Sequence, residues 1–315
     1  MTTYFNQIAA QAAAYGQITP EELGELRRYL WGDGMVSQAE AEALFAANRA
    51  LKDRTAEWCD FFVEAIGEFV LNGTAPRLQC SEEEAAWLIA QIDHDGVVES
   101  MAELECMVRI LERAQNVPVS LKSYVLGVVE REVLSGIGPT RCGGELSATH
   151  ISAAECRIIR RVIFASGGHG PAAVSRYDAE MLFRLKDATL AEENAAEWDA
   201  LFIDGVCNFL KGFTLPHAQI SRERALELKA FVEDAKPNLR GFMGRVVREV
   251  PGVRNHFGKV FGKREASPDY SAIAAEGEAV TDYEREWLEA MIDADGEVDE
   301  LESRLLARLA AESDA

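Results

Sequence analysis

Several familiar patterns are missing from this 315-residue chain, and each absence excludes a class of protein. No GxSxG, HExxH, P-loop or dinucleotide-binding fingerprint occurs, so the common hydrolase, zinc-protease and nucleotide-binding chemistries have no support. The six cysteines stand singly without a CxxC pair, which argues against zinc and redox motifs and fits reduced thiols. Signals for β-strands are nearly absent. We therefore expect an all-α protein that is not an enzyme.

The sequence also lacks any membrane-targeting pattern. No segment has the roughly 18 consecutive apolar residues that a membrane-spanning helix needs, and the N-terminal region lacks the basic and apolar parts of a signal peptide. Basic residues are scarce, with 32 Lys and Arg against 53 Asp and Glu, giving a net charge of −21. Such a protein repels nucleic acid and attracts cations or basic partners. We expect a cytoplasmic protein with protein partners and no nucleic-acid ligand.

What the chain does contain is an internal repeat, the feature that has to be sought before single motifs. The segments ITPEELGELRRYLWGDGMVSQAE from Ile18, CSEEEAAWLIAQIDHDGVVES from Cys80 and VTDYEREWLEAMIDADGEVDELE from Val280 align without a gap. A looser copy, ISAAECRIIRRVIFAS, begins at Ile151 and resumes after an inserted glycine-containing segment. Each copy predicts a helix, a short turn and a second helix, which together form an αα-hairpin.

The starts of the predicted helices are marked by capping boxes, in which a hydroxyl residue is followed three places later by an acidic one. The first helices of the four copies have the pairs Thr19 and Glu22, Ser81 and Glu84, Ser152 and Glu155, and Thr281 and Glu284. The second helices have Ser37 and Glu40, Ser175 and Asp178, and Asp299 and Glu302. We expect the valine after each turn to be buried, namely Val36, Val98, Val174 and Val298.

A larger duplication encloses the hairpins. The segment AEWCDFFVEAIGEFVL from Ala56 resembles AEWDALFIDGVCNFL from Ala196, and both have one apolar helical face. The sequence therefore predicts repeated αα-hairpins that form two related helical-bundle halves, residues 1–145 and 146–315. The tryptophans lie on equivalent apolar faces and are expected in the core.

The acidic turns between the paired helices are the candidate metal sites. With Gly296 at position 6 of an EF-hand loop, acidic residues fall at ligand positions 3, 5, 9 and 12. Position 1 becomes Met291, however, which has no oxygen, and the second copy has Gln91 and Ala102 at positions 1 and 12. The same residues can instead end one helix and start the next, and this interpretation explains more of them than the calcium loop does. The candidate ligands are Asp93, Asp95, Glu99, Asp293, Asp295, Asp299 and Glu302.

Two hypotheses for these turns stay open. Paired carboxylates at a helix C-terminus are unfavourable beside the negative end of the helix dipole, so a cation, water or a nearby arginine is needed to compensate them. A bound ion would be Ca²⁺ or Mg²⁺, held weakly, with a Kd on the order of 10⁻⁴ M or higher because ligands are missing. An EF-hand-like, calcium-responsive regulator is the alternative to a helical scaffold. His94 lies beside the carboxylates of its turn and is more simply a solvated turn residue.

The acidic turn with a glutamate six residues after its glycine resembles the tellurite-resistance TerB-like family. The matching residues are Asp295, Gly296, Val298 and Glu302 in the last copy, and Asp33, Gly34, Val36 and Glu40 in the first. The resemblance covers about 30 residues in each copy. It implies a non-enzymatic, all-α cytoplasmic protein linked to envelope or metal stress, which works through protein partners and senses divalent cations.

One segment departs from the acidic composition. Residues 236–264 contain eight basic residues against one acidic residue, a net charge of +7. Three interpretations remain: contact with an anionic membrane surface, binding of a phosphorylated or nucleic-acid ligand, or docking on the acidic hairpins of the same chain. The charge of the whole protein favours the last of these.

Overall fold

The structure is a computed structural model. It describes residues 14–30, 35–93, 98–144, 150–165, 174–211, 282–293 and 298–313, with a few separate residues before 14. The described part is all-α, as predicted, and its only β-type pairing is one isolated bridge between Gln79 and Asn116. The helices are α2 (Pro20–Leu30), α3 (Gln38–Ala50), α4 (Ala56–Asn72), α5 (Glu82–Ile92), α6 (Met101–Arg113), α7 (Val119–Ser135), α8 (Ala153–Ile163), α9 (Arg176–Thr189), α10 (Trp198–Leu210), α15 (Asp282–Ile292) and α16 (Glu300–Ser313), with a short 3₁₀ helix η1 (Pro139–Gly144).

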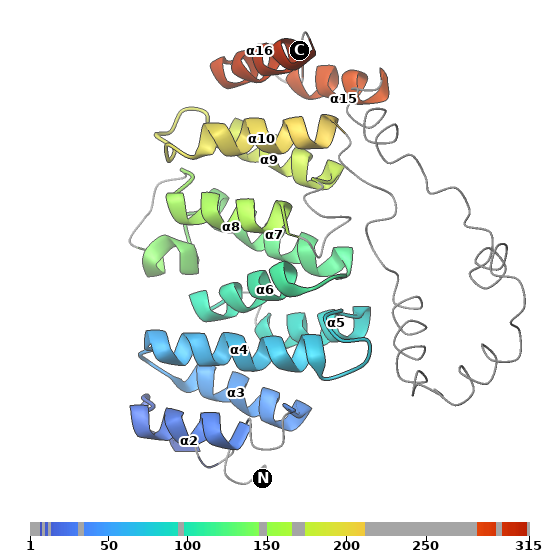
Figure 1. Cartoon of the computed structure of the whole chain (residues 1–315). Helices are drawn as coiled ribbons and strands as arrows, with labels where there is room; N and C mark the ends of the chain where they lie inside the picture. The colour runs from blue at the N-terminus through green and yellow to red at the C-terminus, as the bar shows by residue number, and fades with distance from the viewer. Residues whose placement is uncertain are drawn as a thin grey trace, which may run out of the picture.

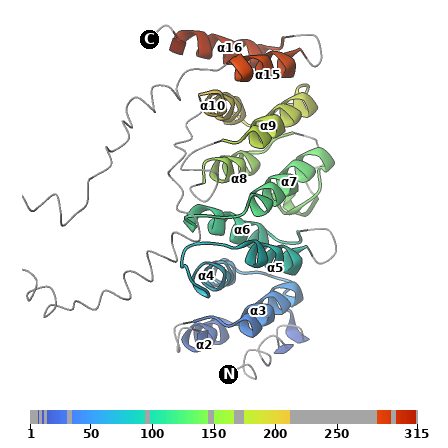
Figure 2. The same ribbon diagram turned by 90° about the vertical axis from the view of Figure 1, so that its right-hand side faces the viewer.

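The helices pack in a continuous stack with the two chain ends at opposite ends of it (Figure 1). Figure 2 shows two columns: α2, α4, α6, α8 and α10 follow one another in one column, and α3, α5, α7 and α9 in the other. Each helix packs against the next member of its own column, for example α4 against α6 and α7 against α9. One hydrophobic core runs through all of these layers. In the part of the chain that is described, no helix is both long and apolar enough to span a lipid bilayer.

The capping boxes position the helix starts as predicted. Ser37 accepts a hydrogen bond from the backbone N–H of Glu40, and the Glu40 carboxylate accepts one from Ser37 N–H at 2.9 Å. The same reciprocal pair is present at the starts of α2, α5, α8, α9 and α16. The start of α6 has a further box, Ser100 with Glu103, which the repeat alignment did not identify. Thr281, the predicted cap of α15, lies outside the described residues.

The same set of aromatic contacts occurs twice. In the first set, the ring of Phe45 lies 5.1 Å from that of Phe62 and 5.9 Å from that of Trp87, which is 4.8 Å from Phe69. In the second set, the ring of Phe183 lies 5.1 Å from Phe202 and 5.8 Å from Trp287, which is 4.7 Å from Phe209. Helices α3, α4 and α5 therefore pack as α9, α10 and α15 do, and the described tryptophans lie in or against the core as expected.

One burial prediction is wrong. Val36, Val98 and Val174 are buried, but Val298 is 55% exposed. Val98 packs near α7, the helix that follows α6. Val98 and residues of α7 line the same cleft. No described helix follows α16, so the described part of the chain contains no counterpart of α7 to cover Val298.

Candidate functional site

The predicted metal ligands lie at helix ends, and the structure brings only some of them together. Asp93 ends α5, where its N–H donates to the carbonyl of Ile89 at 2.7 Å. Asp293 ends α15 in the same way and is exposed. Glu99 is exposed, and its own N–H donates to the carboxylate of Glu103. Asp95, Asp295 and His94 lie outside the described residues, so metal binding at these turns stays a prediction.

Asp299 and Glu302 meet, but a lysine lies between them. The Lys186 ammonium donates to Asp299 Oδ2 and to Glu302 Oε1, each at 2.6 Å, and Asp187 is 2.9 Å away. Burial opposes ionisation of Asp299, but the hydrogen bonds from Lys186 and from the N–H groups that begin α16 lower its pKa. The Lys186 ammonium thus occupies the space between these two carboxylates, although one positive charge balances only one of them. Among the described residues, no group of three or more His, Cys, Asp or Glu side chains is placed to hold a metal ion.

The acidic residue that caps the second helix of each hairpin is buried. This holds for Glu40, Glu103, Asp178 and Glu302. Three of the four receive a hydrogen bond from a neighbouring helix: Asn48 donates to Glu103 at 3.0 Å, Lys122 to Asp178 at 2.6 Å, and Lys186 to Glu302 at 2.6 Å. These contacts connect α3 to α6, α7 to α9, and α9 to α16. The capping boxes therefore hold neighbouring layers together.

Asn48 and Lys186 occupy corresponding positions of α3 and α9. The fully buried Asn48 donates to Glu103 and to Ser100, and its carbonyl accepts the Trp58 indole N–H at 3.1 Å. Burial raises the pKa of Glu103, against the lowering effect of its hydrogen bonds from Ser100 and Asn48. The two corresponding sites thus hold their carboxyl groups by different means, a neutral amide in one and an ammonium in the other.

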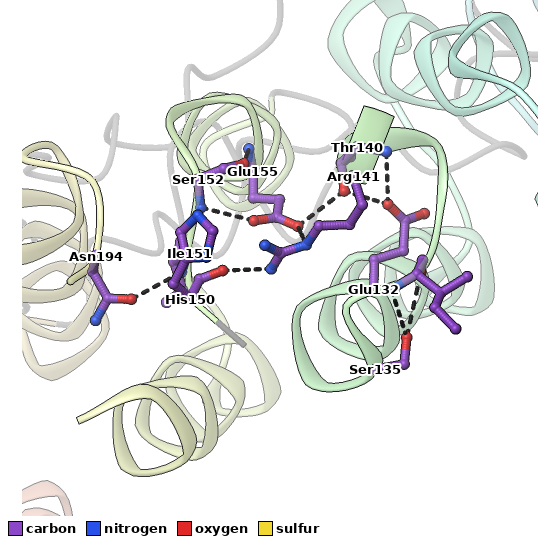
Figure 3. A network of polar contacts seen from close by, with 10 residues as sticks. Glu132, Ser135, Thr140, Arg141, His150, Ile151, Ser152, Glu155 and Asn194 are labelled. Carbon is purple, nitrogen blue, oxygen red and sulfur yellow. Dashed lines mark hydrogen bonds and ion pairs between the residues drawn. The ribbon is translucent and has the colours of Figure 1, made fainter. Parts of the chain in front are cut away.

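A second buried network joins α7, η1 and α8 (Figure 3). Arg141 and Glu155 are both fully buried, and Arg141 Nε lies 2.9 Å from Glu155 Oε1. The guanidinium also donates to the backbone carbonyl of His150. Thr140 lies between Glu155 and Glu132, and its hydroxyl contacts a carboxylate oxygen of each. Sequence reasoning identified Glu155 as a helix-capping residue but missed the rest of the network, because Glu132, Thr140 and Arg141 reach it only when α7, η1 and α8 pack together.

A groove lies between α4 and α6. Its volume is about 730 Å³, and it is lined by Cys59, Asp60, Val63, Glu64, Met101, Ala102, Glu105, Arg109 and Arg113. Asp60 and Glu64 are exposed and make no ion pair with a described residue, whereas Glu105 is held by Arg161 of α8 at 2.6 Å. Burial raises the pKa of the Cys59 thiol, which keeps it protonated and a poor nucleophile. The groove thus combines apolar side chains with charged groups of both signs, and two of its carboxylates make no ion pair with a described residue.

Comparison of the chain with models of protein families, with curated proteins and with solved structures finds no match. The function is therefore argued from the geometry. The basic segment 236–264 lies outside the described residues, so its interpretations stay predictions.

Proposed function

We propose that the protein is a non-enzymatic scaffold of TerB-like type that binds protein partners in the groove between α4 and α6. One observation carries the proposal: Asp60 and Glu64 make no ion pair with a described residue and lie beside the apolar side chains of a groove on a continuous stack of helices. Helical stacks of this kind present extended surfaces for partners. The protonated Cys59 thiol in the groove also fits a binding surface better than a catalytic one.

The partner is a segment that combines apolar and basic residues. An amphipathic helix can place apolar side chains against Val63, Met101 and Ala102, while its lysines or arginines reach Asp60 and Glu64. The net charge of −21 attracts such a segment from a distance and speeds its association.

The TerB-like part of the proposal includes the division into two related halves of repeated hairpins. The doubled aromatic cluster supports it, because Phe45, Phe62 and Trp87 pack as Phe183, Phe202 and Trp287 do. The proposed cytoplasmic location is supported by the cysteines, since the five whose side chains are described are all free.

Charge reversal tests the groove. The Asp60→Lys/Glu64→Lys variant is compared with Glu286→Lys/Glu289→Lys, which makes the same change on the exposed face of α15. Partners captured by the wild-type protein in its own cell extract are identified by cross-linking and mass spectrometry. We expect the groove variant to lose partners that cross-link through basic segments, and the α15 variant to keep them. Equal capture by both variants would contradict the proposal.

Weak binding of Ca²⁺ or Mg²⁺ is a separate part of the proposal, and a calcium-responsive regulator is the alternative to it. The contact of Lys186 with Asp299 and Glu302 weighs against the alternative in the last hairpin, since both are EF-hand ligand positions. Calorimetric titration with each ion compares wild type with Asp293→Asn/Asp295→Asn. A weak heat of binding that the wild type shows and the variant lacks supports the cation site. Tight Ca²⁺ binding by the wild type, together with a change in helix packing, supports the calcium-responsive regulator.

A further inference from the structure

A second cleft, separate from the α4–α6 groove, lies where α7 ends. It has a volume of about 510 Å³, within the range of sites that bind small molecules. Its walls are mainly apolar and include Ile137, which is 69% exposed, and Leu134, which is 46% exposed. The lining residues are Val98, Val128, Arg131, Glu132, Leu134, Ser135, Ile137, Gly138 and Pro139.

One polar side chain in this cleft has an unused atom. Glu132 is only 4% exposed, and its Oε2 accepts hydrogen bonds from the N–H and the hydroxyl of Thr140. Its Oε1 is buried and has no hydrogen-bond partner among the described residues. Figure 3 shows the carboxylate with one oxygen towards Thr140 and the other turned away from the network. A buried carboxylate oxygen without a donor costs free energy that a ligand can recover.

The network around Glu132 is also short of positive charge. Among the described residues it contains two carboxyl groups, those of Glu132 and Glu155, and a single guanidinium, that of Arg141, which contacts Glu155. The Thr140 hydroxyl touches both carboxyl groups but has one proton, so it can donate to only one of them at a time. Burial raises the pKa of Glu132, and the charge of Glu155 adds to this effect, whereas the hydrogen bonds from Thr140 and the charge of Arg141 lower the pKa. The site therefore favours a cation next to Glu132.

The backbone shapes the floor of the cleft around this carboxyl group. Gly138 has a φ of +147°, and a Cβ atom there would lie 2.3 Å from Glu132 Cγ. Glycine thus lets the loop close over the stem of Glu132. Arg131, the one basic residue of the lining, is exposed, and its guanidinium approaches Gly127, which lies one helical turn before it in α7.

We propose that this cleft binds a small organic ammonium ion with an apolar alkyl or aryl body. The ammonium N–H donates to Glu132 Oε1 and supplies the positive charge that the network lacks. The apolar body covers Leu134 and Ile137 and packs against Val98 and Val128. A metal ion fits less well, because the only other side-chain oxygen of the described lining, that of Ser135, already hydrogen-bonds the backbone of Ile137.

The test uses phenethylammonium as the probe on the full chain, followed by the NMR methyl signals of Val98, Val128, Leu134 and Ile137. We expect saturable shifts confined to these methyl groups, and much weaker shifts with the neutral 2-phenylethanol. Glu132→Gln removes the charge and is expected to weaken binding about tenfold or more. Equal binding of the two probes, or binding unchanged in Glu132→Gln, would overturn the proposal.

A second pair of variants tests the site without changing Glu132, so the result does not depend on the folding of Glu132→Gln. Leu134→Lys places a positive charge at the exposed wall of the cleft, and Leu306→Lys makes the same change on an exposed residue of α16. The first is expected to repel the phenethylammonium probe and the second to leave binding unchanged. Wild-type-like binding by Leu134→Lys would contradict the proposed site.

Discussion

Lys186 and Glu302 are 116 residues apart in sequence, yet the ammonium of Lys186 lies 2.6 Å from Glu302 Oε1. Both side chains are only 1% exposed. The pair connects α9 to α16, so it joins the C-terminal hairpin to the rest of the stack. A helix-capping carboxylate thus also holds together elements that are distant in the chain.

Replacing Lys186 by methionine is expected to destabilise the protein by about 3–5 kcal/mol. The change leaves Asp299 and Glu302 without their cation, and an unpaired buried charge is expensive. Urea unfolding measures the loss, with exposed Lys52→Met as the control. A Lys186→Met variant as stable as the control would show that the pair does not stabilise the stack.

Replacing Asn48 by leucine is expected to cost about 2–3 kcal/mol. The substitution leaves the Trp58 indole N–H without an acceptor and Glu103 without a donor. Asn48→Lys should cost less, because lysine at the corresponding position of α9 pairs with the capping carboxylate there. Thermal unfolding of the two variants measures which is more stable. A leucine variant more stable than the lysine variant would contradict the prediction.

We predict that the stability contributed by the contact between α6 and α8 depends on the salt concentration. Arg161 of α8 binds both Glu105 and Glu112 of α6, and these groups are partly exposed. Arg161→Met is expected to cost about 1 kcal/mol at low salt and less at high salt, because salt screens such pairs. The comparison is Arg157→Met, an exposed arginine on the same helix. A cost that does not change with salt would point to lost packing instead of charge.

We predict that the contribution of Glu132 to folding stability depends on pH. Its pKa in the folded state is raised above the ordinary value of 4.5, mainly by burial. The stability associated with a raised carboxyl pKa is present below that ordinary value and is lost as the pH rises through the folded-state pKa. Glu132→Gln does not titrate, so its stability relative to wild type should increase from pH 4.5 upward and then level off. A difference that stays constant with pH would contradict the raised pKa.

The helix starts could be predicted from sequence because a capping box is local. Ser37 and Glu40, or Ser152 and Glu155, identify a helix start without knowledge of what lies nearby. The partners of those carboxylates could not be predicted, because Asn48 and Lys122 come from other layers and reach them only once the helices stack. A signal was nevertheless present, since Lys186 follows Leu182 and Phe183 on the buried face of α9, where an unpaired lysine is unfavourable.

The wrong prediction for Val298 has the same origin. Its local pattern matches that of Val98, and only the presence of a covering helix separates the buried valine from the exposed one. Similarly, the local pattern of Asp299 and Glu302 fits both a calcium loop and a helix start. Lys186, which occupies the space between them, comes from a distant segment.

The most direct test of the proposed scaffold is photo-cross-linking from the groove in living cells. A benzophenone amino acid replaces Glu64 in one variant and Glu289 of α15 in another, and the cross-linked peptides are identified by mass spectrometry. We predict that position 64 captures a partner through a segment rich in basic and apolar residues, whereas position 289 does not. Identical products from both positions, or only acidic segments captured at position 64, would contradict partner binding in the α4–α6 groove.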